Sequence, residues 1–393
     1  MNLNYLADRF VFRNLKKIAY GYLELTDSKG NNFFFGNKDN SLKANIKIND
    51  PNFTLKLLRH GSSGLGESYI NRGFETNNLP ALIELSARNI SVTYKFSGLL
   101  KIPFIQNILN KLILTNTKER SKKNISSHYD LGNEFFSVWL DKSLTYSCGI
   151  FNSTDETLEK AQINKYNKLI DLIHPKPGNK ILEIGCGWGG FAEQIAKNYD
   201  IQLDCITISK KQYEYAKAKI NKLGLNHKVN IKMMDYRDIR KNYDNIVSIE
   251  MIEAVGEKYL SSYFKSIKEN LMPDGRAAIQ SIVINDNLYD RYRAKEDFIQ
   301  KFVFPGGFLP SLKSLKKLSL NSGLIFNSQN LYGEHYSNTL QKWRKSFLNS
   351  WDQISRQGFN LSFKNMWDFY LSYCEAGFKS KNIDLIQFSL CNK

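Results

Sequence analysis

The 393-residue sequence has few cysteines and no long apolar run. Its five cysteines are scattered and form no C-x-x-C pair, which argues against a disulfide framework and a zinc site and fits a reducing cytosol. We therefore expect no metal. No stretch of about 18 uninterrupted apolar residues occurs, so we expect no membrane-spanning helix. Residues 1–20 include Asp8, Arg9 and Arg13 and lack the apolar centre of a signal peptide.

The chain also lacks the common motifs of nucleic-acid binding: it has no zinc finger, no RNP-type aromatic motif and no compact arginine-rich helix. Its formal net charge of +17 still suggests a polyanionic partner, either nucleic acid or an anionic membrane surface. A lysine-rich composition that serves only solubility would give the same charge. With the nucleic-acid motifs absent, we expect an anionic membrane surface as the partner and no nucleic acid.

Length and pattern predict two domains, each large enough to bury a core. Within residues 1–114, an alternating pattern at residues 43–48 and a glycine-rich turn at Gly61 to Gly66 predict a smaller α+β domain. Residues 115–130 are polar and basic and predict a linker. Residues 131–393 are expected to form the larger domain.

Residues 105–113, just before this linker, carry apolar side chains at helical spacing. A core-facing helix is the favoured interpretation of that pattern, and an interfacial amphipathic helix is the alternative.

The most informative stretch, K-I-L-E-I-G-C-G-W-G-G from residue 180, is an apolar run followed by a glycine-rich turn and a helical pattern. Such a loop lets a nucleotide-like ligand approach the backbone closely. Gly185, Gly187 and Gly190 also satisfy the dinucleotide pattern G-x-G-x-x-G, and a turn without any ligand is a further alternative. Glu183 favours a cationic ligand, because a carboxylate at that position would repel a pyrophosphate.

The region after this loop alternates strand and helix patterns. This alternation predicts an α/β fold with a doubly wound, mostly parallel sheet that binds ligands at the carboxyl ends of its strands. The expected strands are residues 201–208, 229–234, 245–249 and 276–284, the expected helices are 209–223 and 258–271, and a turn is expected at 273–275.

Residues at two strand ends argue against a nicotinamide cofactor. An NAD site would place an acidic residue at the end of the second strand, where this chain has Thr207, Ser209 and Gln212. Asp235 ends the third strand and is placed to accept a hydrogen bond from an adenine amino group. E-x-G-x-G after a strand resembles the first motif of S-adenosylmethionine-dependent methyltransferases, for which these features are suitable.

Six motifs occur in order along the chain: H-Y-D-L-G-N-x-F-F…T-Y-S-C, L-E-I-G-C-G-W-G-G, T-I-S-x-x-Q, M-x-E-x-V-G, F-P-G-G-x-L-P-S and H-Y-x-x-T-L. Together they resemble the cyclopropane-fatty-acyl-phospholipid synthase family, which includes mycolic acid cyclopropane synthases. The resemblance extends over nearly the whole chain, because residues 61–69 resemble the N-terminal domain of the full-length bacterial enzymes.

This resemblance implies a methyltransferase fold of class I and S-adenosylmethionine as cofactor. It implies that a methyl or methylene group is transferred to the double bond of an unsaturated phospholipid acyl chain. The residues expected to contact the cofactor are Tyr129, Tyr146, Ser147, Glu183, Gly185, Gly187, Gly189, Thr207, Ser209, Gln212, Asp235, Tyr236, Arg237 and Glu250.

Members of the family hold a bicarbonate that removes a proton for ring closure. By motif, its contacts correspond to Cys148, Glu253, Tyr336 and the main chain around Ile282. Each residue also has a simpler interpretation: a small buried cysteine, a glutamate that caps a helix and a tyrosine that only packs.

Two positions depart from the family pattern, because Ala254 and Gln280 stand where histidine is usual. Gln280, counted here with the catalytic residues, donates hydrogen bonds but cannot titrate. Weaker anion binding or a methyl-branched product would follow from these departures.

The resemblance also implies a lipid-binding insertion at about residues 285–310 and a cytoplasmic protein peripheral to the inner face of the membrane. We expect a homo-oligomer, with a dimer as the preferred state. Two other functions stay open: a small-molecule N-methyltransferase on the same scaffold, and a catalytically inactive lipid-binding homologue, suggested by Ala254 and Gln280.

Overall fold

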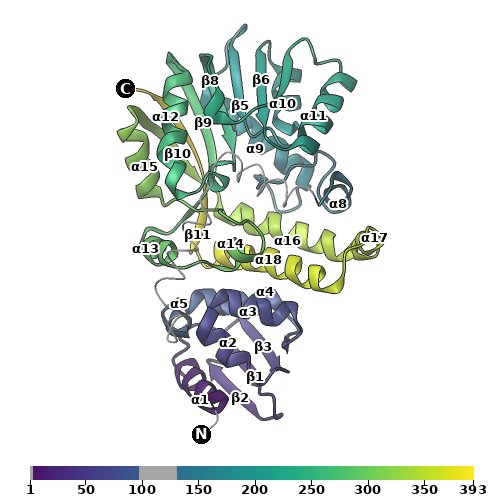
Figure 1. Cartoon of the computed structure of the whole chain (residues 1–393), viewed down its shortest axis with the longest axis vertical. Coiled ribbons are helices and arrows are strands. Elements are labelled where there is room, and N and C mark those ends of the chain that lie inside the picture. Colours follow the sequence, from purple (N-terminus) through teal and green to yellow (C-terminus); the bar gives the residue numbers. More distant parts are fainter. Residues whose placement is uncertain (1–2, 97–130) are drawn as a thin grey trace. The chain divides into compact units, whose positions relative to one another are not determined.

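The computed structural model describes residues 3–96 and 131–393, which form two compact units (Figure 1). The first unit contains residues 3–96 together with Asp290–Pro305 and Leu348–Asn382. The second contains residues 131–289, Gly306–Phe347 and Ile383–Lys393. The predicted linker at 115–130, the helical pattern at 105–113 and Tyr129 lie outside the described residues.

The first unit is built on a four-stranded sheet in the order β2-β1-β3-β4. Its strands are β1 (Tyr22–Thr26), β2 (Asn32–Gly36), β3 (Lys43–Ile48) and β4 (Phe74–Glu75). Strand β3 confirms the alternating pattern, since Ala44, Ile46 and Ile48 are buried on one face. The helices of this part of the chain are α1 (Leu3–Leu15), α2 (Phe53–His60), α3 (Ser62–Ile70), α4 (Leu79–Arg88), α5 (Ile90–Thr93) and the 3-10 helix η1 (Tyr94–Phe96).

The glycine-rich turn predicted at Gly61 to Gly66 is wrong, because only Gly61 separates two helices and the following residues belong to α3. The other glycines serve close packing. A Cβ atom on Gly66 would lie 2.2 Å from the ring of Phe298, and one on Gly64 would lie 2.4 Å from a main-chain oxygen. Local sequence could not predict this packing, because the atoms that leave no room for a side chain belong to other segments of the chain.

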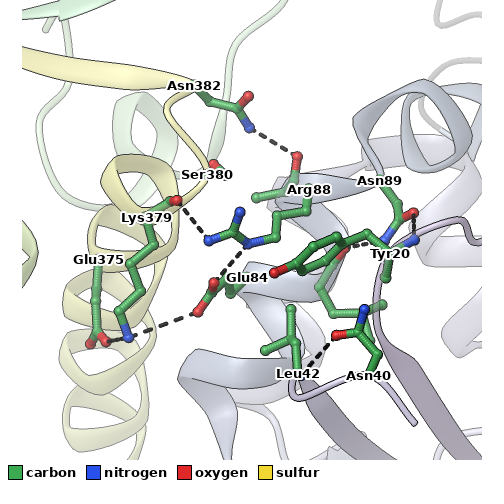
Figure 2. Close-up of polar contacts among 12 residues, drawn as sticks. Tyr20, Asn40, Leu42, Glu84, Arg88, Asn89, Glu375, Lys379, Ser380 and Asn382 are labelled. Carbon is green, nitrogen blue, oxygen red and sulfur yellow. Dashed lines mark hydrogen bonds and ion pairs between the residues drawn. The ribbon is translucent and has the colours of Figure 1, made fainter. Parts of the chain in front are cut away.

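Later segments complete this unit. They form the helices α13 (Asp286–Ala294), α14 (Phe298–Phe302), α17 (Trp351–Arg356) and α18 (Leu361–Lys379). Figure 2 shows Arg88 of α4 donating to Glu84 at 2.8 Å and to the main-chain oxygen of Lys379 at 2.9 Å. Asn382 donates to the oxygen of Ala87 at 3.0 Å. Hydrogen bonds therefore join the C-terminal helix to the N-terminal residues.

The second unit confirms the predicted α/β fold with a mostly parallel sheet flanked by helices (Figure 1). The strand order is β10-β11-β9-β8-β5-β6-β7, and only β11 runs antiparallel to its two neighbours. The strands are β5 (Lys180–Ile184), β6 (Gln202–Thr207), β7 (Val229–Met233), β8 (Tyr243–Ile249), β9 (Leu271–Ile284), β10 (Leu324–Leu331) and β11 (Ile383–Asn392).

The flanking helices follow the strands as the alternating pattern predicts. They are α8 (Asn133–Ser137), α9 (Leu158–Ile173), α10 (Gly190–Asn198), α11 (Lys210–Lys222), α12 (Leu260–Asn270), α15 (Leu312–Asn321) and α16 (Gly333–Asn349), with the 3-10 helices η2 (Tyr236–Asp238), η3 (Ile252–Ala254) and η4 (Glu257–Tyr259). A buried apolar cluster joins α9, α10 and α11 to the sheet through side chains such as Leu169, Phe191 and Ala216. No helix within the described residues is both long and apolar enough to cross a bilayer.

One local prediction in this unit is wrong. The turn expected at residues 273–275 is an irregularity within β9. Leu271 pairs with Tyr243 of β8 and Arg276 pairs with Asn245, so the intervening residues of β9 face a single residue of β8. A proline and a glycine are compatible with such a bulge, as they are with a turn.

Candidate active site

A cavity opens at the carboxyl ends of β5, β6 and β8, where ligands bind in sheets of this kind. Most residues predicted to contact the cofactor line it: Tyr146, Ser147, Glu183, Gly185, Gly187, Thr207, Gln212, Asp235, Tyr236, Arg237 and Glu250. Gly189 and Ser209 do not line the cavity, and Tyr129 lies outside the described residues.

The glycine loop after β5 has the left-handed backbone that favours glycine. The φ angles are 83° at Gly185, 51° at Gly187 and 78° at Gly189. A Cβ atom on Gly185 would press on Met251 at 2.9 Å, whereas one on Gly187 would meet no atom within 4 Å. Gly187 therefore leaves open space at the cavity, and Gly189 is the N-cap residue of α10. This backbone suits the close approach of a ligand.

Glu183 lies at the end of β5 with its carboxylate buried. Burial raises its pKa to about 7. The thiol of Cys205 donates to one carboxylate oxygen at 3.2 Å, so acceptor capacity remains for the hydroxyl groups of a sugar. The buried carboxylate beside a glycine loop fits S-adenosylmethionine.

Two further groups of polar residues shape the cavity. Arg237 holds the carboxylate of Asp235 through Nε at 2.8 Å and Nη2 at 2.6 Å. The hydroxyl of Thr207 donates to the Gln212 side chain at 3.0 Å, which orients that amide. Ser209 caps α11 by accepting a hydrogen bond from the Gln212 main chain at 3.3 Å, so its role is to position neighbouring residues.

The other side of the cavity is bounded by the carboxylate of Glu250, which follows β8. Its Oε1 accepts hydrogen bonds from the main-chain N–H of Cys148 at 2.9 Å and from the amide of Gln280 at 2.7 Å. Its Oε2 accepts a hydrogen bond from the hydroxyl of Tyr336 at 2.5 Å. The backbone of Glu250 has a φ of 50°, which is uncommon for glutamate and typical of residues held in place for function.

Glu253 provides a second carboxyl group near that of Glu250. Its Oε1 accepts the main-chain N–H of Ile282 at 2.5 Å, and its Oε2 is buried without a hydrogen-bond partner. Burial, together with the negative charge of Glu250, raises the pKa of Glu253 to about 8. This carboxyl group is therefore protonated over much of the neutral range.

Cys148 contributes its main chain to this cluster. Its thiol is fully buried, donates to the oxygen of Gly149 at 3.1 Å and lies 3.8 Å from the hydroxyl of Thr339. Burial raises the pKa of the thiol well above its usual range. The thiol therefore stays neutral, and it is the amide of Cys148 that reaches Glu250.

The described residues do not fit a bound bicarbonate. The resemblance implies Cys148, Glu253, Tyr336 and the main chain around Ile282 as its contacts. The Cys148 and Ile282 amides and the Tyr336 hydroxyl already donate to protein carboxylates, as does the side chain of Gln280. A second anion there would lie against the charge of Glu250, at a cost in free energy. Within residues 3–96 and 131–393, no group of three or more His, Cys, Asp and Glu side chains could hold a metal ion.

Two polar residues of this site were not predicted from the sequence. Gln387 of β11 donates to the Oε1 of Gln280 at 2.8 Å, which turns the NH₂ of Gln280 toward Glu250. Lys165 of α9 is fully buried, and its ammonium donates to the hydroxyl of Ser147 at 2.6 Å. Burial lowers the pKa of Lys165 to about 8.

A local signal for Lys165 was present in the sequence. It lies four residues from both Ala161 and Leu169, which are buried on the inner face of α9. A lysine buried on such a face needs a polar or charged partner for its ammonium group. Gln387 had no such signal, because its importance depends on the pairing of β11 with β9.

Comparisons with known proteins identify the family to which this site belongs. Residues 116–388 match the family model for mycolic acid cyclopropane synthetase. The chain is 33% identical over 352 residues to the tuberculostearic acid methyltransferase UfaA1 of Mycobacterium tuberculosis, covering 85% of this chain and 80% of that protein. It is 33% identical over 350 residues to the cyclopropane-fatty-acyl-phospholipid synthase of Escherichia coli, covering 88% and 87% respectively.

Two solved structures are also similar to this chain. The mycolic acid cyclopropane synthase CmaA1 complexed with SAH and CTAB has a TM-score of 0.65 and 26% identity, covering 69% of this chain and 98% of that one. Coclaurine N-methyltransferase has a TM-score of 0.64 at 17% identity, covering 84% of this chain and 99% of that one, which is a likeness of fold alone.

Proposed function

The chain belongs to the mycolic acid cyclopropane synthetase family, and on that premise we propose that it modifies the double bonds of unsaturated phospholipid acyl chains. It is an S-adenosylmethionine-dependent methyltransferase. The product in this proposal is a cyclopropane or methyl-branched acyl chain, gained by addition of a methyl or methylene group.

One observation carries the proposal. The cavity that fits S-adenosylmethionine is bounded by Glu250, whose carboxylate is hydrogen-bonded to Gln280 and Tyr336. A cofactor pocket and a buried cluster suited to proton transfer therefore adjoin each other. Ring closure requires removal of a proton from carbon, so a buried base beside the cofactor suits this reaction.

The residues around the cavity suit an alkene substrate. Bound S-adenosylmethionine supplies an electrophilic methyl group, and attack by the alkene leaves positive charge on the acyl chain. Aromatic rings pack against one another next to this region: Tyr146, which lines the cavity, and Trp343 have ring centroids 5.2 Å apart, and those of Tyr336 and Trp343 are 6.2 Å apart. Such rings exclude water and stabilise transient positive charge.

The proposal extends to the partner and the location. We expect the protein to take its lipid at an anionic membrane surface, peripheral to the inner face, and to act as a dimer. The net charge of +17 supports the membrane contact. Binding to anionic vesicles should weaken as salt is added, because surface charge is screened. Equal binding to neutral and anionic vesicles at all salt concentrations would contradict this part.

Expression in a host with unsaturated phospholipids tests the function directly. Mass spectrometry of the lipids should show a gain of about one CH₂ per modified chain, and purified protein with S-adenosylmethionine and unsaturated vesicles should reproduce it. Labelled methyl groups that appear only on small amines would favour an N-methyltransferase. Lipid binding without any mass gain would favour an inactive homologue.

A further inference from the structure

The carboxylate of Glu250 occupies the hydrogen-bonding position that the family resemblance assigns to bicarbonate. Cys148 and Tyr336 were expected to contact the anion, and Gln280 stands where the family usually has a histidine. In the structure all three donate to Glu250, at 2.9, 2.5 and 2.7 Å. Three donors from separate parts of the chain thus converge on one side chain, as they would on a bound anion.

We propose that Glu250 replaces bicarbonate in this protein and is itself the proton acceptor of the reaction. This inference rests on the proposed function, because only an alkene substrate leaves a carbon-bound proton to remove. The main-chain N–H of Ile282 was also expected to contact the anion. It donates to Glu253, so it is not available to bicarbonate either.

The geometry of Glu250 suits this role. A carboxylate offers roughly four lone-pair positions. Oε1 accepts two hydrogen bonds and Oε2 accepts one, which leaves capacity on Oε2 for a proton. Glu250 also lines the cavity, beside the short side chain of Ala254. The substrate can therefore approach the carboxylate from the cofactor side.

The proposed step balances without any further reactant. A C–H bond of the transferred methyl group breaks, and its electron pair forms a C–C bond to the cationic carbon of the acyl chain, which closes the ring. The proton passes to Glu250 and leaves to solvent between turnovers. Glu253 acts as a neutral neighbour, so the cluster carries one negative charge before the step.

Two substitutions at position 250 separate this proposal from the bicarbonate mechanism. Glu250→Gly removes the carboxylate, frees its three donors and suits the φ of 50°. Glu250→Gln keeps the size of the side chain but cannot accept the proton. Thermal unfolding and calorimetry with S-adenosylmethionine establish that both variants fold and bind cofactor.

Binding of ¹³C-labelled bicarbonate, followed by NMR, decides the proposal without any lipid substrate. We expect binding to Glu250→Gly, and none to the wild type or to Glu250→Gln. Bicarbonate bound by the wild type as well as by the glycine variant would overturn the proposal. This readout also keeps a failure of the proposed lipid substrate distinct, because that failure would appear only as missing lipid product in every variant.

Turnover in carbonate-depleted buffer gives the second readout, with sodium chloride as the control for added salt. The wild type should be fully active without bicarbonate, and both variants should lose roughly a hundredfold in rate or more. Added bicarbonate should restore activity to Glu250→Gly alone. A wild type that depends on bicarbonate, or a Glu250→Gln enzyme of normal rate, would refute the role of Glu250.

Discussion

At the residue scale, Gly187 allows the cofactor loop to be tested with little disturbance of the fold. A Cβ atom there meets nothing within 4 Å, and aspartate tolerates the left-handed backbone better than most residues. We expect Gly187→Asp to fold but to lose about tenfold or more in affinity for S-adenosylmethionine, because a charged side chain enters the cavity. Isothermal calorimetry measures the loss.

Gly224 provides the matched control for this variant. It has a similar φ of 69° and equally open space, but it does not line the cavity. Gly224→Asp should therefore bind S-adenosylmethionine normally. Equal losses of affinity in the two variants would assign the effect to backbone strain and contradict the placement of the ligand.

The raised pKa of Glu183 predicts how cofactor binding depends on pH. Its pKa is raised to about 7 by burial, and the ionised carboxylate is the better acceptor for sugar hydroxyls. Affinity for S-adenosylmethionine should therefore rise as pH increases toward 7 and fall about tenfold for each pH unit below it. Glu183→Gln should bind more weakly at high pH and show a flat profile. A wild-type affinity that stays constant from about pH 5.5 to 8 would contradict this role.

At the element scale, Ser209 connects β6 to α11 as the helix cap. Its hydroxyl accepts from the Gln212 main chain, and it does not line the cavity. Ser209→Ala should lower the free energy of unfolding by about 1 kcal/mol, as measured by urea denaturation, and change cofactor affinity much less. Ser261→Ala, on the exposed side of α12, is the control. A large loss of affinity without loss of stability would make Ser209 a direct ligand contact.

The elements of the second unit were predictable from local patterns. Strands such as β5 and β8 are largely buried, and their ends carry the polar residues that shape the cavity. The predictions failed where distant partners decide the structure. The glycines of α3 are explained by Phe298, and the orientation of Gln280 is explained by Gln387. Neither partner is visible in the sequence around the residue it affects.

The same limit applies to the candidate site. The motifs indicated Glu250 as a cofactor contact and Gln280 as a departure from the family, but their hydrogen bond joins residues 30 positions apart. The convergence of donors on Glu250 depends on the three-dimensional arrangement of β8, β9 and α16. Individual functional residues could be predicted, whereas the charge balance among them could not.

At the scale of the whole molecule, buried carboxyl groups determine how stability depends on pH. Burial raises the pKa of Glu183 to about 7 and that of Glu253 to about 8, above their ordinary value near 4.5. Between the ordinary pKa of 4.5 and the raised value of about 8, the folded chain binds more protons than the unfolded chain. Its stability should therefore be greatest at the acidic end of this window and fall as pH rises toward 8.

Thermal unfolding without ligand checks this trend from about pH 5.5 to 8. The substitution Glu253→Gln should flatten the profile, because its amide needs no proton to remain neutral. Glu257→Gln, at an exposed residue of η4, should leave the slope unchanged. A wild-type melting temperature that increases steadily with pH would contradict the raised pKa values.

Strand β11 has a consequence for how the protein is made. It spans Ile383–Asn392, yet it lies between β9 and β10 in the sheet. During synthesis, β10 emerges from the ribosome before the strand that pairs with it exists. Gln387 also arrives with β11, so the amide that orients Gln280 is translated after Glu250 and Gln280 themselves. Nascent chains interrupted before this strand can already contain the glycine loop and Glu250 but not the completed polar cluster, so the cofactor loop is translated before the cluster can form.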